Sequence, residues 1–326
     1  MHNTSSRHVA ASHLLALLGL ALLASPAAFA QAFPSKPITL VVGFGAGGGT
    51  DIQARALARA AAVELGQPII IENRPGMSAT LGPAAMAQRA APDGYTLAVT
   101  PATLFRVPHL SKVSYDALKD FSYIINVTSY SYSLSVGKNA PWKNAQEFIA
   151  YAKAHPGKLN FSSTGTAGTG QVTALRLAKL TGTEFNAIPY KSSGEAFAAV
   201  MGGHVDFTAE GGFGPHYEGG NIRSLGIFSG ERLAKHPALP TLREQGLDIV
   251  AKSSWGIGGP KGMDPKVVKV LHDAFRKAMA DPDFLRILER ENQPLTYMGS
   301  QDYTQHAAEL LAEEGKFIKD LGIKAE

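Results

Sequence analysis

Cysteine is absent from this chain of 326 residues, which excludes disulfide bonds, thiolate zinc sites and cysteine nucleophiles. Neither sign of charge dominates, because 31 Lys and Arg residues stand against 27 Asp and Glu residues without a dense basic run. A nucleic acid is therefore not an expected partner. After residue 30, no stretch is apolar enough to cross a bilayer. The stability of such a chain must come from packing alone.

The first 30 residues have the three parts of an export signal. Arg7 gives a positive start, residues 10–24 are apolar, and Ala28-Phe29-Ala30 has the small-x-small pattern of a cleavage site. A membrane anchor fits less well, because an apolar run of about 15 residues is shorter than the roughly 20 that a spanning helix needs. The sequence therefore predicts a periplasmic protein, cleaved after residue 30, whose mature length suits two domains.

An apolar strand that runs into a glycine-rich turn and then a helix start is the most informative segment. Residues 38–42 are β-branched and nearly continuous, and Thr50 or Asp51 suits the N-cap of a helix over 52–65 that Gly66 ends. Free N–H groups near the positive end of the helix dipole would hold a carboxylate or phosphate. The alternative is that the glycines serve only the tight turn. The candidate ligand contacts here are Phe44, Gly45, Ala46, Gly47, Thr50 and Asp51.

This turn does not fit a nucleotide site. Gly43, Gly45 and Gly48 match the G-x-G-x-x-G spacing, but the acidic Glu72 is too distant, and no Lys follows the glycines as in a Walker A motif. No cofactor is therefore expected.

A second combination of strand, small-residue loop and helix begins at residue 159. Its loop, at 162–170, precedes a helix over about 171–180, and its hydroxyl and N–H groups both donate to carboxylates. The alternative is an ordinary loop that Thr169 caps. Two such loops that face each other would neutralise an anion between two helix N-termini. The candidate ligand contacts here are Ser163, Thr164, Gly165, Thr166 and Thr169, with Asp206 added from a later expected strand because it could lie at the cleft.

The remaining pattern predicts two α/β units with parallel sheets and a helical C-terminal part. Asp264 and Pro265 predict a helix start, Asp281-Pro282 marks the break before the next helix, and 300–321 is amphipathic. A helix is also expected near 82–91, and another that ends near residue 201. Parallel strands are expected at 38–42, 69–72 and 95–99 in the first unit, and at 159–161, 185–188 and 205–208 in the second.

Enzyme motifs are poorly represented. Ser135-Val136-Gly137-Lys138 matches S-x-x-K without its S-D-N or K-T-G companions, and neither G-x-S-x-G nor H-E-x-x-H occurs. The ten histidines are scattered, so no metal site is expected. A periplasmic enzyme with Asp51 or Asp206 as general base is the rival hypothesis, and it lacks a nucleophile and a metal. A sensor ectodomain that reports to a membrane kinase is another.

Ordered motifs run along the whole mature chain, from Phe33-Pro34-Ser35-Lys36-Pro37 to Trp255-Gly256. Between them lie Gly47-Gly48-Gly49-Thr50-Asp51, Glu72-Asn73-Arg74-Pro75-Gly76 and Gly202-Gly203-His204-Val205-Asp206. In this order they resemble the substrate-binding proteins of tripartite tricarboxylate transporters, the TctC or Bug family of periplasmic receptors.

The resemblance implies an α/β fold of the type II periplasmic-binding-protein class, a Venus flytrap in which each lobe is a mostly parallel sheet flanked by helices. The first lobe would comprise residues 31–130 and 251–326, and the second 131–250, with hinges near 128–132 and 248–253. It also implies a monomeric, non-enzymatic receptor that grips a small organic carboxylate between the two loops and delivers it to a membrane permease.

The chain departs from the family pattern around the expected pocket, where the first loop lacks the family's prolines. Aromatic residues in the first loop, near the hinges and in the segment after residue 206 could enclose a flat ring, which favours an aromatic acid such as terephthalate. The alternatives are an aliphatic di- or tricarboxylate of four to six carbons, or that these aromatics belong to the core. The expected contacts to the ligand body are Phe44, Tyr132, Phe213 and Trp255, with Arg106 or His216 at a second carboxylate.

Overall fold

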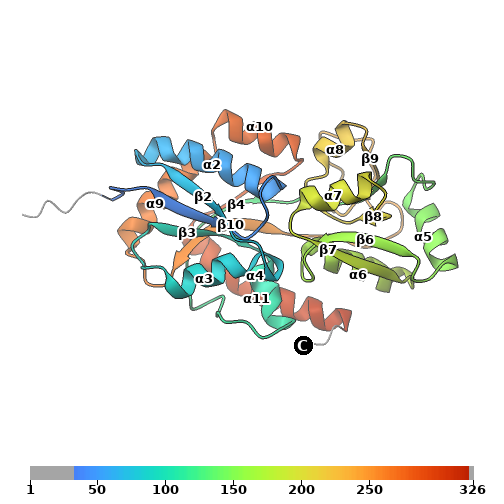
Figure 1. Ribbon diagram of the computed structural model, residues 1–326, viewed down its shortest axis with the longest axis horizontal. Coiled ribbons are helices and arrows are strands. Elements are labelled where there is room, and N and C mark those ends of the chain that lie inside the picture. The colour runs from blue at the N-terminus through green and yellow to red at the C-terminus, as the bar shows by residue number, and fades with distance from the viewer. Residues whose placement is uncertain (1–32, 323–326) are drawn as a thin grey trace, which may run out of the picture. The chain divides into compact units, whose positions relative to one another are not determined.

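The computed structural model describes residues 33–322, and its helices and strands all lie in the compact unit that begins at Lys36. The predicted export signal at residues 1–30 lies outside the described residues. Within them, two mixed sheets form, each with helices on its faces (Figure 1). No helix of this described part is both long enough and apolar enough to span a membrane.

The first sheet has the strand order β11-β4-β10-β3-β1-β2. β1 pairs in parallel with β2 and β3, whereas β10 lies antiparallel between β3 and β4, and β11 is antiparallel to β4. Parallel pairing was predicted correctly for the first hundred residues, but the sheet as a whole is mixed. Its strands are β1 (Ile38–Val42), β2 (Ile69–Asn73), β3 (Thr96–Pro101), β4 (Phe121–Ser129), β10 (Ser254–Pro260) and β11 (Leu295–Met298).

Helix α2 (Gly49–Leu65) begins three residues earlier than the sequence predicts. Gly48 is its N-cap, so Thr50 and Asp51 lie in the first turn, and the predicted cap is wrong. The reason is that the Asp51 carboxylate folds back to accept an N–H of the preceding loop. Gly66 ends the helix as predicted, at a φ of 65° in the left-handed region that glycine tolerates.

The second sheet has the order β7-β6-β8-β5-β9. β6 pairs in parallel with β7 and β8, as predicted, while β5 is antiparallel to β8 and β9. This sheet is therefore also mixed rather than mostly parallel. Its strands are β5 (Ser133–Gly137), β6 (Leu159–Thr164), β7 (Phe185–Tyr190), β8 (Phe207–Thr208) and β9 (Ile222–Ile227).

The chain passes between the two sheets twice. Strand β4 leads through Tyr130 and Tyr132 into β5, and the chain returns between β9 and β10. The two connections lie side by side, because the N–H of Tyr130 donates to the carbonyl oxygen of Ser253 at 2.8 Å. Figure 1 shows these segments between the sheets.

Apolar and aromatic side chains fill the core beside each sheet. Phe148 and Phe161 both pack on Phe207 in the second core, with ring centroids 4.9 and 5.3 Å away. Tyr123 and Tyr303 pack edge to face at 4.9 Å in the first. Burial of such large rings is the main driving force for these cores.

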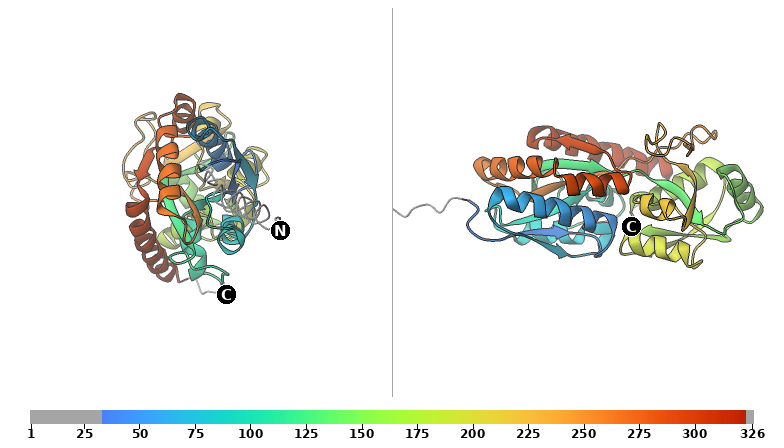
Figure 2. Two further views of the ribbon diagram at one scale, coloured as in Figure 1. Left: turned by 90° about the vertical axis from the view of Figure 1, so that its left-hand side faces the viewer. Right: turned by 90° about the horizontal axis from the view of Figure 1, so that it is seen from above.

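The C-terminal helices cover the first sheet. Asp264 caps α9 as predicted, and the predicted break at Asp281-Pro282 is the start of α10, which Asp281 caps. Helix α11 packs on β4 and reaches α6 beside the second sheet (Figure 2, red). The remaining helices are α3 (Leu81–Arg89), α4 (Thr103–Arg106), α5 (Ala145–Ala154), α6 (Thr169–Thr181), α7 (Ser193–Met201), α8 (Gly214–Glu218), α9 (Pro265–Ala278), α10 (Pro282–Arg290) and α11 (Ser300–Leu321).

Candidate functional site

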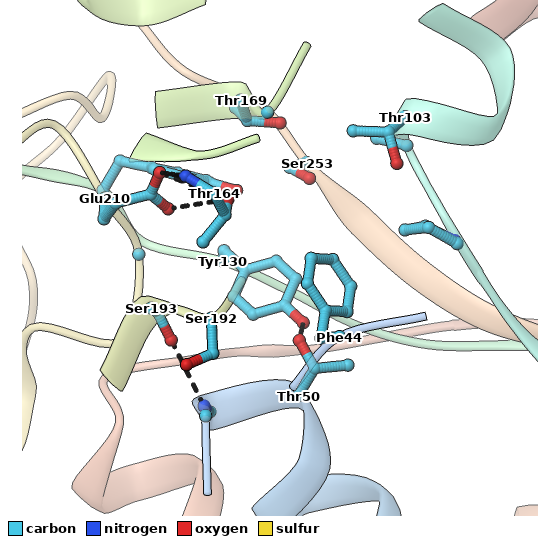
Figure 3. Close-up of a pocket in the computed structure, with 17 residues that line it drawn as sticks. Phe44, Thr50, Thr103, Tyr130, Thr164, Thr169, Ser192, Ser193, Glu210 and Ser253 are labelled. Atoms are coloured by element: carbon cyan, nitrogen blue, oxygen red, sulfur yellow. Dashed lines mark hydrogen bonds between the residues drawn. The ribbon is translucent and has the colours of Figure 1, made fainter. Parts of the chain in front are cut away.

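Loops of both sheets and both connections between them line one cavity of about 40 Å³ (Figure 3). Five of the residues expected at the ligand line it, namely Phe44, Thr50, Tyr132, Thr164 and Thr169. Twelve further residues, which were not among the expected contacts, complete the lining. They are Gly48, Gly49, Pro101, Ala102, Thr103, Tyr130, Gly168, Ser192, Ser193, Glu210, Gly211 and Ser253.

Three helices begin at this cavity. Gly48, Gly168 and Ser192 are the N-caps of α2, α6 and α7, and each lines the cavity together with the residue that follows it. The N–H groups of a first helical turn have no acceptor within the helix, and the dipole makes that end positive. Three positive helix ends around one small space suit an anion.

Hydroxyl groups and aromatic rings form much of the remaining wall. The side-chain hydroxyls of Thr50 and Tyr130 share a hydrogen bond, and Phe44 lies beside them (Figure 3). Thr103 differs, because its Oγ1 is buried and has no hydrogen-bond partner among the described residues. A buried hydroxyl without a partner is costly, so Thr103 is available to donate to a bound molecule.

The first glycine loop is held by Asp51, which does not line the cavity. The Asp51 carboxylate accepts from the N–H of Gly47 at 2.9 Å, from Arg55 Nε at 3.0 Å and from Asn73 Nδ2 at 2.9 Å. Although burial raises the pKa of this carboxyl, the hydrogen bonds from Arg55, Gly47 and Asn73 outweigh it and hold the pKa below its usual value. Asp51 therefore fixes the shape of the loop.

Several hydrogen bonds join the loops of the two sheets directly. The N–H of Gly45 donates to the carbonyl oxygen of Lys191 at 3.1 Å, and the N–H of Gly49 to Ser193 Oγ at 3.3 Å. These contacts occupy loop N–H groups that were expected to hold the ligand, and they close the cavity on this side. Gly45, Ala46 and Gly47 do not line it.

A family model described as the tripartite tricarboxylate transporter family receptor matches residues 53–323. The chain belongs to this family of receptors. The "UPF0065 protein in gbd 5'region" of Cupriavidus necator is 45% identical to it over 309 residues, which cover 94% of each chain. The predicted family is therefore confirmed.

Two solved structures with bound carboxylates are similar to this receptor. Rpa4515 of R. palustris, solved with adipate, has a TM-score of 0.85 at 27% identity, over 90% of this chain and 100% of that one. MatC from Rhodopseudomonas palustris, solved with malate, has a TM-score of 0.82 at 29% identity, over 88% and 100%. They confirm the periplasmic-binding-protein fold, and the family consists of substrate-binding receptors rather than enzymes.

Three of the five residues of the second loop that were expected to contact the ligand do not line the cavity. Ser163 Oγ donates to Gln171 Oε1 at 2.8 Å inside the protein and does not line the cavity. Gly165 has a φ of 75° and lies against Ser78, while Thr166 is exposed, and neither lines the cavity. Only Thr164 and Thr169 of this group do.

Asp206 and Arg106 bind protein groups outside the cavity lining. The Asp206 carboxylate accepts from the N–H of Asn160 at 2.7 Å. The Arg106 guanidinium, 2% exposed, donates to both oxygens of Glu314 and to the carbonyl oxygen of Ala167. With these partners, Arg106 is occupied by the protein itself.

Three further residues expected at the ligand body pack against other parts of the receptor, with Phe213 and Trp255 fully buried and His216 half-buried. Phe213 is fully buried in a core cluster, and His216 packs on the ring of Phe197 at 4.7 Å, where burial lowers the pKa of the imidazole. Trp255 is fully buried and donates through Nε1 to Gln53 at 3.0 Å. None of the three lines the cavity, whose rings are those of Phe44, Tyr130 and Tyr132.

Glu210 is the ionisable group that the sequence analysis did not select. It follows β8, is 4% exposed, and lines the cavity opposite the first loop (Figure 3). Burial raises its pKa to about 7, against hydrogen bonds from Thr164 and the N–H of Gly211 that favour the ionised form. The sequence gives only a weak indication of Glu210. The Glu-Gly-Gly run follows shortly after a predicted strand, and residues at the ends of strands often contact ligands.

Sequence signals for the other missed residues are of two kinds. Ser192 accepts from the N–H of Glu195 as an N-cap, so the pattern of strand, small residues and helix occurs a third time before α7. Tyr130 and Ser253 lie in the predicted hinges. Within residues 33–322, no group of three or more His, Asp or Glu side chains is placed to hold a metal ion.

Proposed function

We propose that this receptor captures an organic carboxylate in the cavity between its two sheets and delivers it to the membrane permease of a tripartite tricarboxylate transporter. The convergence of the N-termini of α2, α6 and α7 on one cavity supports this proposal. Adipate and malate, the molecules bound in two similar structures, are both carboxylates.

Binding requires the two halves of the receptor to separate and close again. A first lobe of residues 31–130 and 251–326, and a second of 131–250, would turn about the paired connections at Tyr130 and Ser253. A cavity of about 40 Å³ has room for a few water molecules but not for a six-carbon acid. Ligand entry therefore needs the lobes to open, and their closure excludes water from the carboxylate.

The residues that we propose to touch the carboxylate are those whose donors line the cavity. Thr50 and Thr169 belong to the expected set, and Thr103 joins them because its hydroxyl lacks a protein partner. Thr164 lines the cavity too, but its N–H and hydroxyl groups both donate to Glu210. Asp51, Ser163 and the remaining loop residues hold the loops in shape rather than the ligand.

Three rings in the cavity wall favour a ligand with a flat or aromatic body. Phe44, Tyr130 and Tyr132 supply this apolar surface. Terephthalate carries a second carboxylate, for which Arg106 was expected, and Arg106 is bound to Glu314. We therefore favour an acid with one carboxylate over terephthalate or an aliphatic di- or tricarboxylate.

A thermal-shift screen of the purified mature protein against mono-, di- and tricarboxylates tests the proposal, because a ligand that binds only the native state raises the melting temperature. At least one carboxylate should raise it by several degrees. If no acid does so, and denaturation releases no bound acid, the proposed function is wrong.

A substitution of Thr103 tests the location of the site. Thr103→Val removes an unpartnered hydroxyl at constant volume, so it should weaken carboxylate affinity by roughly tenfold, within the range of about 1 to 3 kcal/mol for a lost buried hydrogen bond, without loss of stability. Thr166→Val, at an exposed position of the second loop, is the matched control and should leave affinity unchanged. Equal affinities for both variants would place the ligand elsewhere.

The proposed delivery to a permease requires the receptor outside the cytoplasm. We propose export to the periplasm with cleavage after residue 30, and function as a monomer. Mass spectrometry of the secreted protein should give a chain that starts at Gln31, and light scattering should give the mass of one chain.

A further inference from the structure

Glu210 is the only carboxylate among the described residues that line the cavity, and no Lys, Arg or His accompanies it there. Its Oε1 accepts from the N–H of Thr164 at 2.8 Å and from Thr164 Oγ1 at 3.2 Å. Arg106 is committed to Glu314. The cavity thus combines three positive helix ends with one buried acid that has no cationic partner.

The groups packed around Glu210 include a helix N-terminus but no side chain with a full positive charge. The first turn of α6 lies against it, since a Cβ added to Gly170 would come within 2.3 Å of Oε1. Tyr130 and Tyr132, in the connection between the sheets, stay neutral because burial raises the pKa of both hydroxyls. Glu291 is a second buried acid nearby, and it does not line the cavity. Among the described residues that line the cavity, no Lys, Arg or His side chain meets Glu210, and the positive end of α6 is the partial charge that lies against it.

We propose that the ligand of this receptor is a zwitterion, whose carboxylate lies at the N-termini of α2, α6 and α7 and whose cationic nitrogen meets Glu210. This inference rests on the proposed function. The rings of Phe44, Tyr130 and Tyr132 add faces that attract a cation. Glu210 is then the residue that makes the receptor specific for ammonium carboxylates.

Charge balance favours this ligand class over a simple carboxylate. An ionised acid that is buried without a partner is strongly disfavoured, and a second carboxylate beside it would add repulsion. A simple carboxylate could bind only if Glu210 took up a proton. A zwitterion brings one charge of each sign, so both Glu210 and the helix ends gain a partner.

Calorimetric titration of the mature receptor with matched pairs of probes tests the inference. The pairs are 4-methylbenzoate with 4-(aminomethyl)benzoate, butyrate with 4-aminobutyrate, and succinate with aspartate, so that the members of each pair differ by an ammonium group. The ammonium member should bind at least thirtyfold more tightly in the pair whose body fits.

The pH dependence of ligand affinity provides an independent test. Glu210 must be ionised to bind an ammonium group, so the affinity of the zwitterion should weaken as the pH falls below about 7 and Glu210 takes up a proton. A simple carboxylate that needs a protonated Glu210 would show the opposite slope, with affinity that rises on acidification.

Substitution of Glu210 assigns the effect to this residue. Glu210→Gln keeps the size and most hydrogen bonds of the side chain, and it should reduce the preference for the ammonium member at least tenfold and flatten the pH profile. Glu291→Gln, at the buried acid outside the lining, is the matched control and should keep both. Melting curves establish that each variant is folded.

The two hypotheses fail in different ways. Tighter binding of the carboxylate without nitrogen, with an affinity that rises on acidification, overturns the zwitterion and leaves the carboxylate receptor standing. The same holds if Glu210→Gln retains the preference of the wild type. Absence of binding by every probe and by the wider panel of carboxylates overturns both.

Discussion

Arg106 and Glu314 form a two-point ion pair in the interior, where their side chains are 2% and 7% exposed. Arg106 Nε and Nη2 donate to the two carboxylate oxygens of Glu314 at 2.7 and 2.6 Å. The remaining nitrogen, Nη1, donates to the carbonyl oxygen of Ala167 at 3.0 Å and to Thr169 Oγ1 at 3.1 Å. The pair thereby ties α4 and α11, beside the first sheet, to the loop that precedes α6.

Removal of Arg106 alone should be strongly destabilising. Arg106→Met leaves Glu314 buried without its partner, so the free energy of unfolding should fall by about 3 to 5 kcal/mol. The double variant Arg106→Met/Glu314→Met should recover part of this loss, because neither charge is then buried. Urea unfolding measures both, and a single variant within about 1 kcal/mol of the wild type contradicts the buried pair.

Asp51 and Asp206 offer a matched comparison of two structural carboxylates. Asp51→Asn should lower the free energy of unfolding by about 1.5 to 3 kcal/mol and should also weaken ligand binding, because the first loop loses its anchor at Gly47. Asp206→Asn should affect stability only, since its carboxylate binds the N–H of Asn160. Weaker ligand binding by the Asp206 variant, measured by calorimetry, would instead show that Asp206 contacts the ligand.

Alanine substitutions at Gly165 and Gly182 distinguish the cost of backbone strain from an effect on closure of the cavity. Both have a positive φ, of 75° and 66°, so alanine at either position costs about 1 kcal/mol of stability. A Cβ at Gly165 would also lie 2.7 Å from Ser78 Oγ, whereas nothing lies within 4 Å of one at Gly182. Gly165→Ala should therefore reduce ligand affinity as well. The Ser78 hydroxyl accepts a hydrogen bond from the N–H of Ala167, and this bond joins a segment beside the first sheet to the second loop. Equal affinities for the two variants would mean that this contact does not support closure.

The ligand-free receptor should be more stable in mild acid than at neutral pH. Burial raises the pKa values of Glu210 and Glu291 to about 7 from the usual 4.5, so the native state holds these protons more tightly than the unfolded state. Their contribution is present in full below about pH 4.5 and is lost as the pH rises to about 7. Each contributes on the order of 3 kcal/mol.

In each of the variants Glu210→Gln and Glu291→Gln, the number of protons released on unfolding near neutral pH should fall by about one, which makes the unfolding free energy less dependent on pH. Denaturant unfolding of the wild type and both variants at several pH values between 5 and 8 gives the slopes. Stability that rises with pH over this range, in the wild type relative to either variant, contradicts the raised pKa values.

Local sequence signals were sufficient for the parallel part of the fold. The strand and turn at 38–48 and the loop at 162–170 predict helix starts because glycine, hydroxyl and apolar residues act within a few positions. Both helices begin earlier than expected, because glycine can occupy the N-cap and leave the polar side chains free to bind elsewhere. The antiparallel pairs were missed, since β10 meets β3 and β4 across more than a hundred residues of sequence.

The candidate site was harder to predict because burial and pairing are tertiary properties. Arg106 and Trp255 have side chains that suit a ligand, and nothing in their sequence neighbourhoods reveals the distant partners Glu314 and Gln53. Glu210 is marked only by its position after a strand. Thr103 follows a buried strand within an apolar run, so its unpartnered hydroxyl emerges only from the packing around it.

The three helix N-termini at the cavity are assigned here to a carboxylate of the ligand. Calorimetric titration of the mature receptor with the tightest-binding acid of the panel, and with the primary amide of that acid, tests this assignment. We expect a stoichiometry of one and an affinity at least a hundredfold weaker for the amide, because the amide has the same body without the negative charge. Equal affinities for the acid and its amide would contradict it.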